Sequence, residues 1–149
     1  IDMLSRVNHK NFVNLIGYCE ENEPFTRMMV FEYAPNGTLF EHLRVKELEH
    51  LDWGARMRVI MGTAYCLNHM HELNPPVVHA NLNSKEIYLT DDYAAKIADT
   101  GFWADLVKKS EESSSSSSVS VSSSASGVAA DADANTYSFG MMVLEVISG

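Results

Sequence analysis

The stretch that decides the fold is His79-Ala80-Asn81-Leu82-Asn83-Ser84-Lys85-Glu86-Ile87, and Asp99-Thr100-Gly101 follows it. Both stretches are polar and lie among short strand-like runs. These runs are Val77-Val78-His79, Ile87-Tyr88-Leu89 and Ala94-Ala95-Lys96-Ile97-Ala98, with Asp91-Asp92 as a turn signal between the last two. The pattern predicts short strands whose connecting loops carry the polar residues.

A long helix is predicted upstream of this stretch. It starts after Asp52, a good N-cap residue, and ends before Asn74-Pro75-Pro76, because proline cannot continue a helix. Large or apolar residues recur along it at steps of three and four, which predicts one buried face. That face comprises Trp53, Met57, Ile60, Met61, Ala64, Leu67 and His71.

The N-terminal part predicts the end of a helix and then a β-hairpin. Ile1, Met3 and Leu4 indicate the end of an apolar helical face, with the start of the domain expected before Ile1. Two apolar runs, 11–19 and 27–33, flank a polar turn at 20–24 and indicate paired strands. After the turn signal Pro35-Asn36-Gly37, Thr38 is expected to cap a short helix through His42-Leu43.

The C-terminal part of the chain contains two segments of contrasting composition, one rich in serine and one rich in apolar residues. Residues 110–134 are rich in serine, with an unbroken run from Ser113 to Ser118, and cannot bury enough apolar surface to offset the entropy of ordering, so we predict a disordered loop. From Thr136 to Gly149 the apolar residues are so dense that we predict a helix buried on most sides.

Composition narrows the class of protein. A chain of 149 residues fits one domain, and its 11 basic and 20 acidic residues give a formal charge of −9 without a basic cluster, which disfavours a nucleic-acid partner. Cys19 and Cys66 lie in apolar stretches without a nearby cysteine and fit reduced, buried thiols in a cytosolic protein. No apolar run reaches the ~20 residues of a membrane span, so we expect the chain alone to be soluble and cytoplasmic.

The quoted residues resemble the kinase domain of plant leucine-rich-repeat receptor-like kinases, and within that class the group with degenerate kinase domains. The matching stretches are residues 4–19 (end of helix C and fourth strand), 30–39 (fifth strand and hinge), 51–53 (start of helix E), 79–101 and 137–149 (helix F). The resemblance implies an α+β, protein-kinase-like fold that is incomplete. It would contain the end of helix C, strands 4 and 5 of the N-lobe and the first half of the mostly helical C-lobe.

The resemblance also implies domain boundaries. Residues 1–34 would form a partial N-lobe with the hinge, 35–109 the first half of the C-lobe, 110–134 an activation-segment-like loop and 135–149 helix F. The glycine-rich loop, the phosphate-pairing lysine and the helices after helix F are expected outside this sequence.

Compared with the kinase patterns H-R-D-L-K-x-x-N and D-F-G, the reactive positions are replaced. Asn81 stands at the general base and Asn83 at the lysine that faces the transferred phosphoryl group. An amide such as Asn81 cannot take the proton of the substrate hydroxyl, and a positioned base contributes roughly 10²–10⁴ in rate. The resemblance therefore implies that no catalytic residue is intact.

Positions that would hold nucleotide and metal are also altered. Glu86 replaces the metal-binding Asn and, with Asp99, could hold Mg²⁺ through oxygen ligands, although an exposed acidic pair is the simpler interpretation. Tyr88 replaces the aliphatic floor under adenine, while Glu32 and Ala34 would offer the backbone hydrogen bonds of the hinge. We expect no cofactor, with ATP and Mg as the alternative.

Five residues are implied in the structural spine of the family. These are Leu4, Leu15, His79, Thr100 and Asn135. Thr100 replaces the Phe that would stack against His79, which forfeits ~1.5–3 kcal/mol of burial. Asn135 replaces an Asp that anchors the catalytic loop, so a charge-assisted hydrogen bond becomes a neutral one of about half the strength.

Three functions follow from these positions. The first is a catalytically impaired kinase-like domain that binds other proteins, receptor kinases among them, as a signalling scaffold. The second is a weak ATP-dependent Ser/Thr protein kinase, and the third is a truncated product without independent function. In the full-length family this domain lies on the cytoplasmic side of the plasma membrane, so membrane contact is expected only through segments outside this chain.

Overall fold

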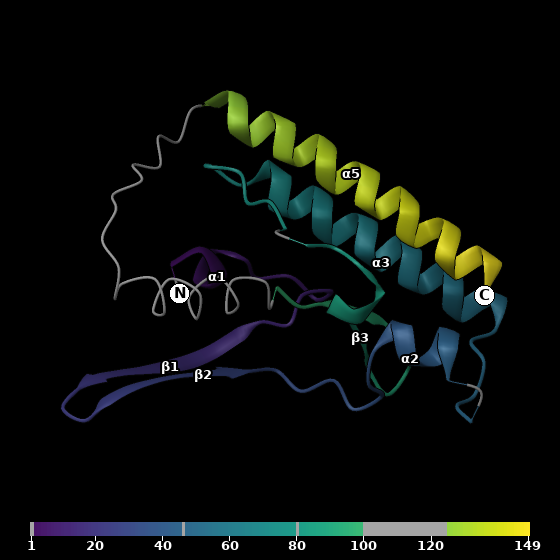
Figure 1. Ribbon diagram of the computed structural model, residues 1–149, viewed down its shortest axis with the longest axis horizontal. Helices are drawn as coiled ribbons and strands as arrows, with labels where there is room; N and C mark the ends of the chain where they lie inside the picture. Colours follow the sequence, from purple (N-terminus) through teal and green to yellow (C-terminus); the bar gives the residue numbers. More distant parts are fainter. Residues whose placement is uncertain (1, 46, 80, 100–124) are drawn as a thin grey trace, which may run out of the picture.

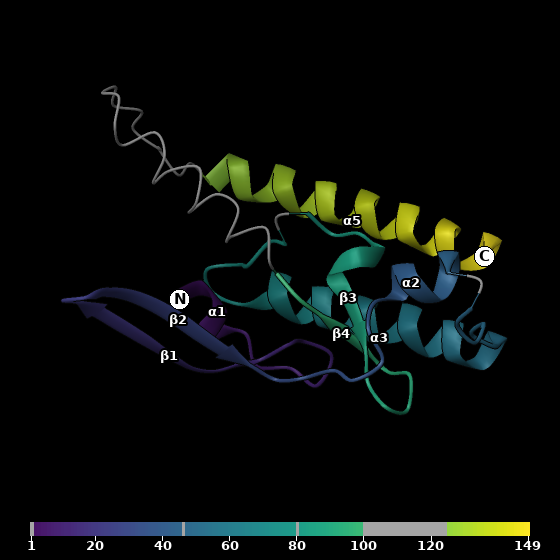
Figure 2. The same cartoon turned by 60° about the horizontal axis from the view of Figure 1, so that its bottom comes forward.

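The computed structural model describes residues 2–45, 47–79, 81–99 and 125–149, with side chains of the last segment from residue 132 onward. A β-hairpin projects from one end of a helical body, and two long helices run side by side along that body (Figures 1 and 2). Thr100 and the part of the predicted loop from 110 to 124 lie outside the described residues.

The hairpin consists of β1 (Leu15–Asn22) and β2 (Phe25–Phe31), which pair antiparallel with Tyr18 opposite Met29. The predicted hairpin is confirmed, but both strands are shifted toward the turn relative to the predicted runs 11–19 and 27–33. Backbone pairing extends through residues 20–22 and 25–26, because polar side chains on an exposed hairpin stay in water and do not oppose pairing. The predicted turn at 20–24 shrinks to Glu23 and Pro24.

Two short helices bracket the hairpin. α1 (Asp2–Arg6) buries Leu4, and α2 (Leu39–Arg44) follows the turn at Gly37, whose φ is +68°. Thr38 caps α2 as predicted. The Glu41 amide donates to the Thr38 hydroxyl at 3.3 Å, and the Glu41 carboxylate accepts from the Thr38 amide at 2.8 Å, so both residues satisfy backbone donors at the helix start.

The long predicted helix is α3 (Trp53–Glu72), and its cap is confirmed because Asp52 accepts a hydrogen bond from the Ala55 amide at 2.7 Å. The predicted buried face is only partly correct, since Leu67 is buried but Trp53 is 60% and Met61 48% exposed. The buried residues are Ala55, Val59, Gly62, Thr63, Cys66, Leu67 and Met70. Many of them are small, which lets α5 and β4 approach α3 closely.

The C-terminal helix α5 (Ala125–Ser148) starts ten residues before the predicted boundary at 135. Residues 125–134 are therefore helical and not part of a loop, which agrees with the high helix propensity of the five alanines in this segment. Burial on most sides is also wrong for this helix. Met142 and Val146 are buried, whereas Tyr137 and Leu144 are 71% and 62% exposed.

A small sheet lies beside α3. β3 (Ile87–Leu89) and β4 (Ala95–Ile97) pair antiparallel across the predicted Asp91-Asp92 turn, and the short 3₁₀ helix η1 (Ser84–Glu86) precedes β3. Residues 77–79 form no strand, which corrects that prediction, because their polar backbone groups bond to helices instead, as at His79 below. The backbone of β4 also bonds to the segment 11–13, with Ile97 donating to Asn11 and accepting from Val13 at 2.8 Å each.

The core has two parts. The first lies among α2, α3, β3 and α5 and contains Leu39, Leu43, Leu51, Ala55, Val59, Ile87, Leu89, Ala95, Met142 and Val146. The second joins the N-terminal segment to α3 and contains Leu4, Val7, Phe12, Cys66, Leu67, Met70, Val77, Leu82 and Ile97. No helix of the described residues is long and apolar enough to cross a membrane.

Candidate functional site

A cavity of about 230 Å³ lies between the end of β2 and the β3–β4 sheet. Four residues singled out from the sequence line it together. These are Glu32, Ala34, Tyr88 and Asp99. The remaining lining residues are Val13, Phe31, Tyr33 and Ala98, so the walls are mainly apolar and the ionisable groups of the lining are two acids and two phenols.

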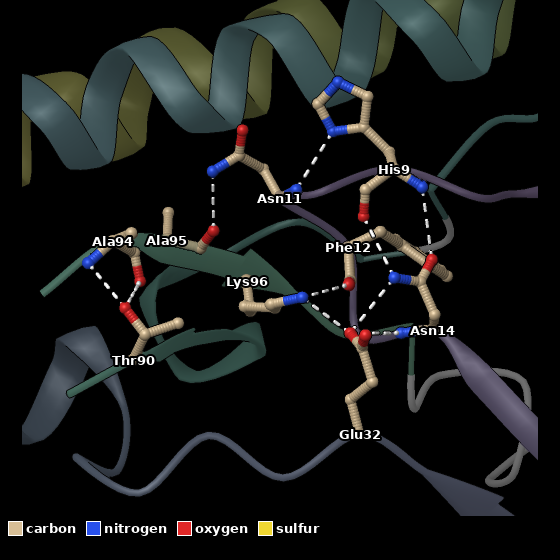
Figure 3. A network of polar contacts seen from close by, with 9 residues as sticks. All are labelled: His9, Asn11, Phe12, Asn14, Glu32, Thr90, Ala94, Ala95 and Lys96. Carbon is tan, nitrogen blue, oxygen red and sulfur yellow. Dashed lines mark hydrogen bonds and ion pairs between the residues drawn. The ribbon is translucent and has the colours of Figure 1, made fainter. Parts of the chain in front are cut away.

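The Glu32 carboxylate fixes the strand end at this cavity (Figure 3). It accepts hydrogen bonds from Lys96 Nζ at 2.6 Å and from the backbone and side-chain nitrogens of Asn14 at 3.2 and 3.0 Å. Partial burial opposes ionisation of Glu32, but these hydrogen bonds from Lys96 and Asn14 lower its pKa below the ordinary value. The Glu32 carboxylate is therefore a structural tie between the end of β2, β4 and the segment before β1.

The loop 79–83 is held by its own polar groups. The buried His79 ring bonds the Ala98 carbonyl through Nε2 at 2.7 Å and accepts from the Asn81 amide through Nδ1 at 3.1 Å. A carbonyl only accepts and an amide N–H only donates, so the ring must carry its proton on Nε2. This arrangement ties residue 81 to the segment that leads into Asp99.

The two asparagines of the loop supply no acid or positive charge. Asn81 is exposed. The Asn83 side chain donates to the Asn81 carbonyl and accepts from the Lys85 amide, at 2.9 Å each, so it caps η1. Lys85 itself lies over the Phe40 ring, with Nζ 4.8 Å from the ring centre.

Helix α5 anchors the same loop through Asn135, which is 4% exposed. Asn135 Oδ1 accepts from the His79 amide at 2.8 Å, and Asn135 Nδ2 donates to the His79 carbonyl at 2.7 Å. His71 of α3 contacts the same Oδ1 through Nε2 at 3.2 Å. Three separate segments therefore meet at one amide.

Of the other residues implied in the spine, Leu4 is 1% exposed and belongs to the second core part, with Leu15 packed against it. The carbonyl of Glu86 accepts from the Ala98 amide at 2.7 Å, which places Glu86 beside the segment that ends in Asp99. Within the described ranges, no group of three or more His, Cys, Asp or Glu could hold a metal ion. Metal binding by Glu86 and Asp99 stays a prediction.

Neither cysteine forms a disulfide. Cys66 is fully buried in α3, and burial raises the pKa of its thiol to about 12, so it is not a nucleophile at neutral pH. Cys19 is partly exposed, which differs from the predicted burial, because it lies on the projecting hairpin.

A family model described as protein tyrosine and serine/threonine kinase matches residues 1–149, the whole chain. The chain belongs to the protein kinase family. The predicted kinase-like fold is confirmed.

Among known proteins, the chain is similar to two plant proteins, one of them an inactive receptor-like kinase. Protein MALE DISCOVERER 2 of Arabidopsis thaliana is 62% identical over 151 residues, which cover 100% of this chain and 22% of the relative. An inactive receptor-like serine/threonine-protein kinase of the same plant is 53% identical over 149 residues, covering 100% of this chain and 29% of the relative. The chain thus spans less than a third of the length of these two relatives.

The chain is also similar to a solved pseudokinase structure. The pseudokinase DRIK1 (drought responsive inactive kinase 1), bound to ENMD-2076, superposes with a TM-score of 0.69 at 49% identity. The matched part covers 97% of this chain and 45% of the DRIK1 chain. The kinase-like fold of this chain is therefore a partial one, as predicted.

The sequence did not point to Asn14 and Lys96, which hold the segment after β2 through the Glu32 carboxylate. Nothing in the sequence signals this contact, because the three residues come from β4, the end of β2 and the segment before β1. Only the tertiary pairing of β4 with residues 11–13 brings them together. A lysine in an alternating strand is otherwise an ordinary surface residue.

Stability of this kinase-like chain should fall as the pH drops below about 6.5. Burial, followed by the neighbouring His69 and Lys10, lowers the pKa of His9 from its ordinary value of 6.5, and the ring accepts from the Asn11 amide at 3.1 Å through Nδ1. Between the lowered pKa and 6.5 the unfolded state binds more protons than the folded state, so stability rises with pH in that window. Thermal melts from pH 5 to 8 measure the slope.

His9→Gln should flatten this pH slope, whereas the same change at the exposed His50 should leave it unaltered. Equal slopes for the wild type and His9→Gln would show that His9 does not titrate with folding.

Proposed function

We propose that this chain is part of a catalytically impaired kinase-like domain that binds other proteins and signals by its conformation. The observation that carries the proposal is Asn81. The amide stands at the position of the catalytic base, in a loop that His79 and Asn135 hold in place. A well-anchored loop without its base retains the kinase shape and loses a contribution of roughly 10²–10⁴ in rate.

The lack of positive charge in the lining of the cavity described above supports the proposal. Phosphoryl transfer depends on positive groups that neutralise the phosphates. Among the described residues that line the cavity there is no lysine or arginine, and Lys96 nearby is paired with Glu32.

We infer that the cleft accepts a compact, flat heteroaromatic group and discriminates against a triphosphate. The backbone between Glu32 and Ala34 and the Tyr88 ring would contact such a group, whereas the described lining offers no lysine or arginine to neutralise phosphates. DRIK1, the pseudokinase with a similar fold, has been solved with ENMD-2076. We therefore propose that ENMD-2076 binds this protein as well, while ATP with Mg²⁺ does not.

Thermal melts of the intact protein with each ligand test this inference. ENMD-2076 should raise the Tm, and millimolar ATP with Mg²⁺ should leave it unchanged. Tyr88→Leu, which restores an aliphatic floor, should leave the fold intact and alter the ENMD-2076 shift. A Tm rise with ATP that requires Mg²⁺ would instead favour the weak-kinase alternative.

As a scaffold, the protein needs binding partners and a site of action in the cell. Because the relatives include receptor-like kinases, we propose that the partners are proteins such as receptor kinases at the cytoplasmic side of the plasma membrane. In an organism from which the gene has been deleted, a gene copy that encodes the Asp99→Ala protein should restore signalling as fully as a wild-type copy. Failure of Asp99→Ala, present at wild-type abundance, would show that cleft chemistry is needed.

A further inference from the structure

Asn135 makes a pair of hydrogen bonds that a carboxylate cannot make. Its partner His79 offers one backbone N–H, which can only donate, and one carbonyl, which can only accept. The distances are 2.8 Å to the amide nitrogen and 2.7 Å to the carbonyl oxygen, so the side chain must present an acceptor and a donor at once. These partners also fix which side-chain atom is oxygen and which is nitrogen.

We propose that the donor Nδ2–H of Asn135 makes asparagine better suited than aspartate to hold the backbone of His79. This goes beyond the scaffold function, because it concerns how the loop is held. An ionised aspartate side chain at this position would keep the bond from the His79 amide. It would also place a second carboxylate oxygen against the His79 carbonyl, where two acceptors face each other.

Because the site is buried, the choice between asparagine and aspartate at position 135 affects the stability of the protein. Asn135 and His79 are 4% and 2% exposed, so water does not reach the His79 carbonyl to replace a lost donor. A buried polar group left without a partner costs about 1–3 kcal/mol. A displaced His79 would also disturb two further hydrogen bonds, because its ring bonds the Ala98 carbonyl and the Asn81 amide.

The groups around the amide determine what a pH experiment would measure. His71 faces Oδ1 from α3, and His79 faces the amide from the loop. The nearest acidic residues in sequence are the exposed Asp133 on α5, the exposed Glu72 next to His71, and Asp99, which follows Ala98. Of these groups, His71 is the one that could form an ion pair with a carboxylate at position 135 and so imitate the expected pH effect.

Asn135→Asp in the intact protein provides the test. At pH 8 the Tm should fall by about 4–8 °C, and at pH 5, where a protonated carboxyl can donate again, by less than about half of that. The same comparison in a His71→Ala background removes the ion-pair explanation, and the smaller loss at pH 5 should persist there. Asn68→Asp, at an exposed position of α3, is the matched control and should change the Tm little at either pH.

An Asn135→Asp protein as stable as the wild type at pH 8, or one with equal losses at both pH values, would overturn the proposal. Should this variant not fold, the wild-type protein still decides. In NMR spectra, one side-chain amide proton of Asn135 should exchange slowly with solvent and lie close to His79. Fast exchange of both amide protons would refute the bond to the His79 carbonyl.

Discussion

Replacing Phe12 by alanine is expected to lower the free energy of unfolding by about 3–5 kcal/mol, the range for aromatic residues removed from a core. Phe12 is 1% exposed and lies in the core part that joins the N-terminal segment to α3. Its backbone also forms a bridge with Ile97 of β4. The cavity would therefore open at the contact that holds the N-terminal segment on the helical body, and urea unfolding of the intact protein measures the loss.

Phe25→Ala is the matched control, because it removes the same side chain from the hairpin, where Phe25 is 75% exposed. Its effect should stay within about 0.5 kcal/mol. Comparable losses for the two variants would contradict the assignment of Phe12 to the core and Phe25 to the surface.

Gly62→Ala is the second change with a large expected effect. A Cβ at Gly62 would lie 2.6 Å from Asn11 Nδ2, which donates to the Ala95 carbonyl at 2.9 Å in a buried site. Displacing this amide costs about 1–3 kcal/mol for the unsatisfied carbonyl, with strain added. The gain of roughly 1 kcal/mol from helix propensity does not offset both terms, so we expect a net loss of about 2 kcal/mol.

Gly140→Ala separates the clash from the helix propensity. Gly140 also lies inside a long helix, but an added Cβ there meets nothing within 4 Å. This variant should be more stable than the wild type by about 0.5–1 kcal/mol. If Gly62→Ala were stabilising to the same degree, α3 would not pack against Asn11 as closely as the structure shows.

The elements of the fold could be predicted where one local rule decides. The Thr38 and Asp52 caps, the turn at Asp91-Asp92 and the end of α3 before Pro75 all follow from local backbone chemistry, and the structure confirms them. The resemblance to kinases also placed Tyr88, Asp99 and the hinge residues around one cleft, which no local rule provides.

The rest depends on packing that a sequence does not display. Helix α3 carries two apolar stripes, and hydrophobicity favoured the larger residues around Met57 and Met61. The stripe with Gly62 and Thr63 is buried instead, because close approach of neighbouring elements requires small side chains. The Asn135 anchor was expected to be a weaker version of a carboxylate contact. The donor function of its amide appears only once the two backbone groups of His79 are located.

The central claim is that Asn81, at the position of the catalytic base, cannot take a proton from an incoming hydroxyl. Transfer of radiolabelled phosphate from ATP by the intact protein, to itself or to a generic protein substrate, measures this most directly. The account predicts no incorporation above that of heat-inactivated protein, and no change on Asp99→Ala. Incorporation that Asp99→Ala abolishes would contradict it.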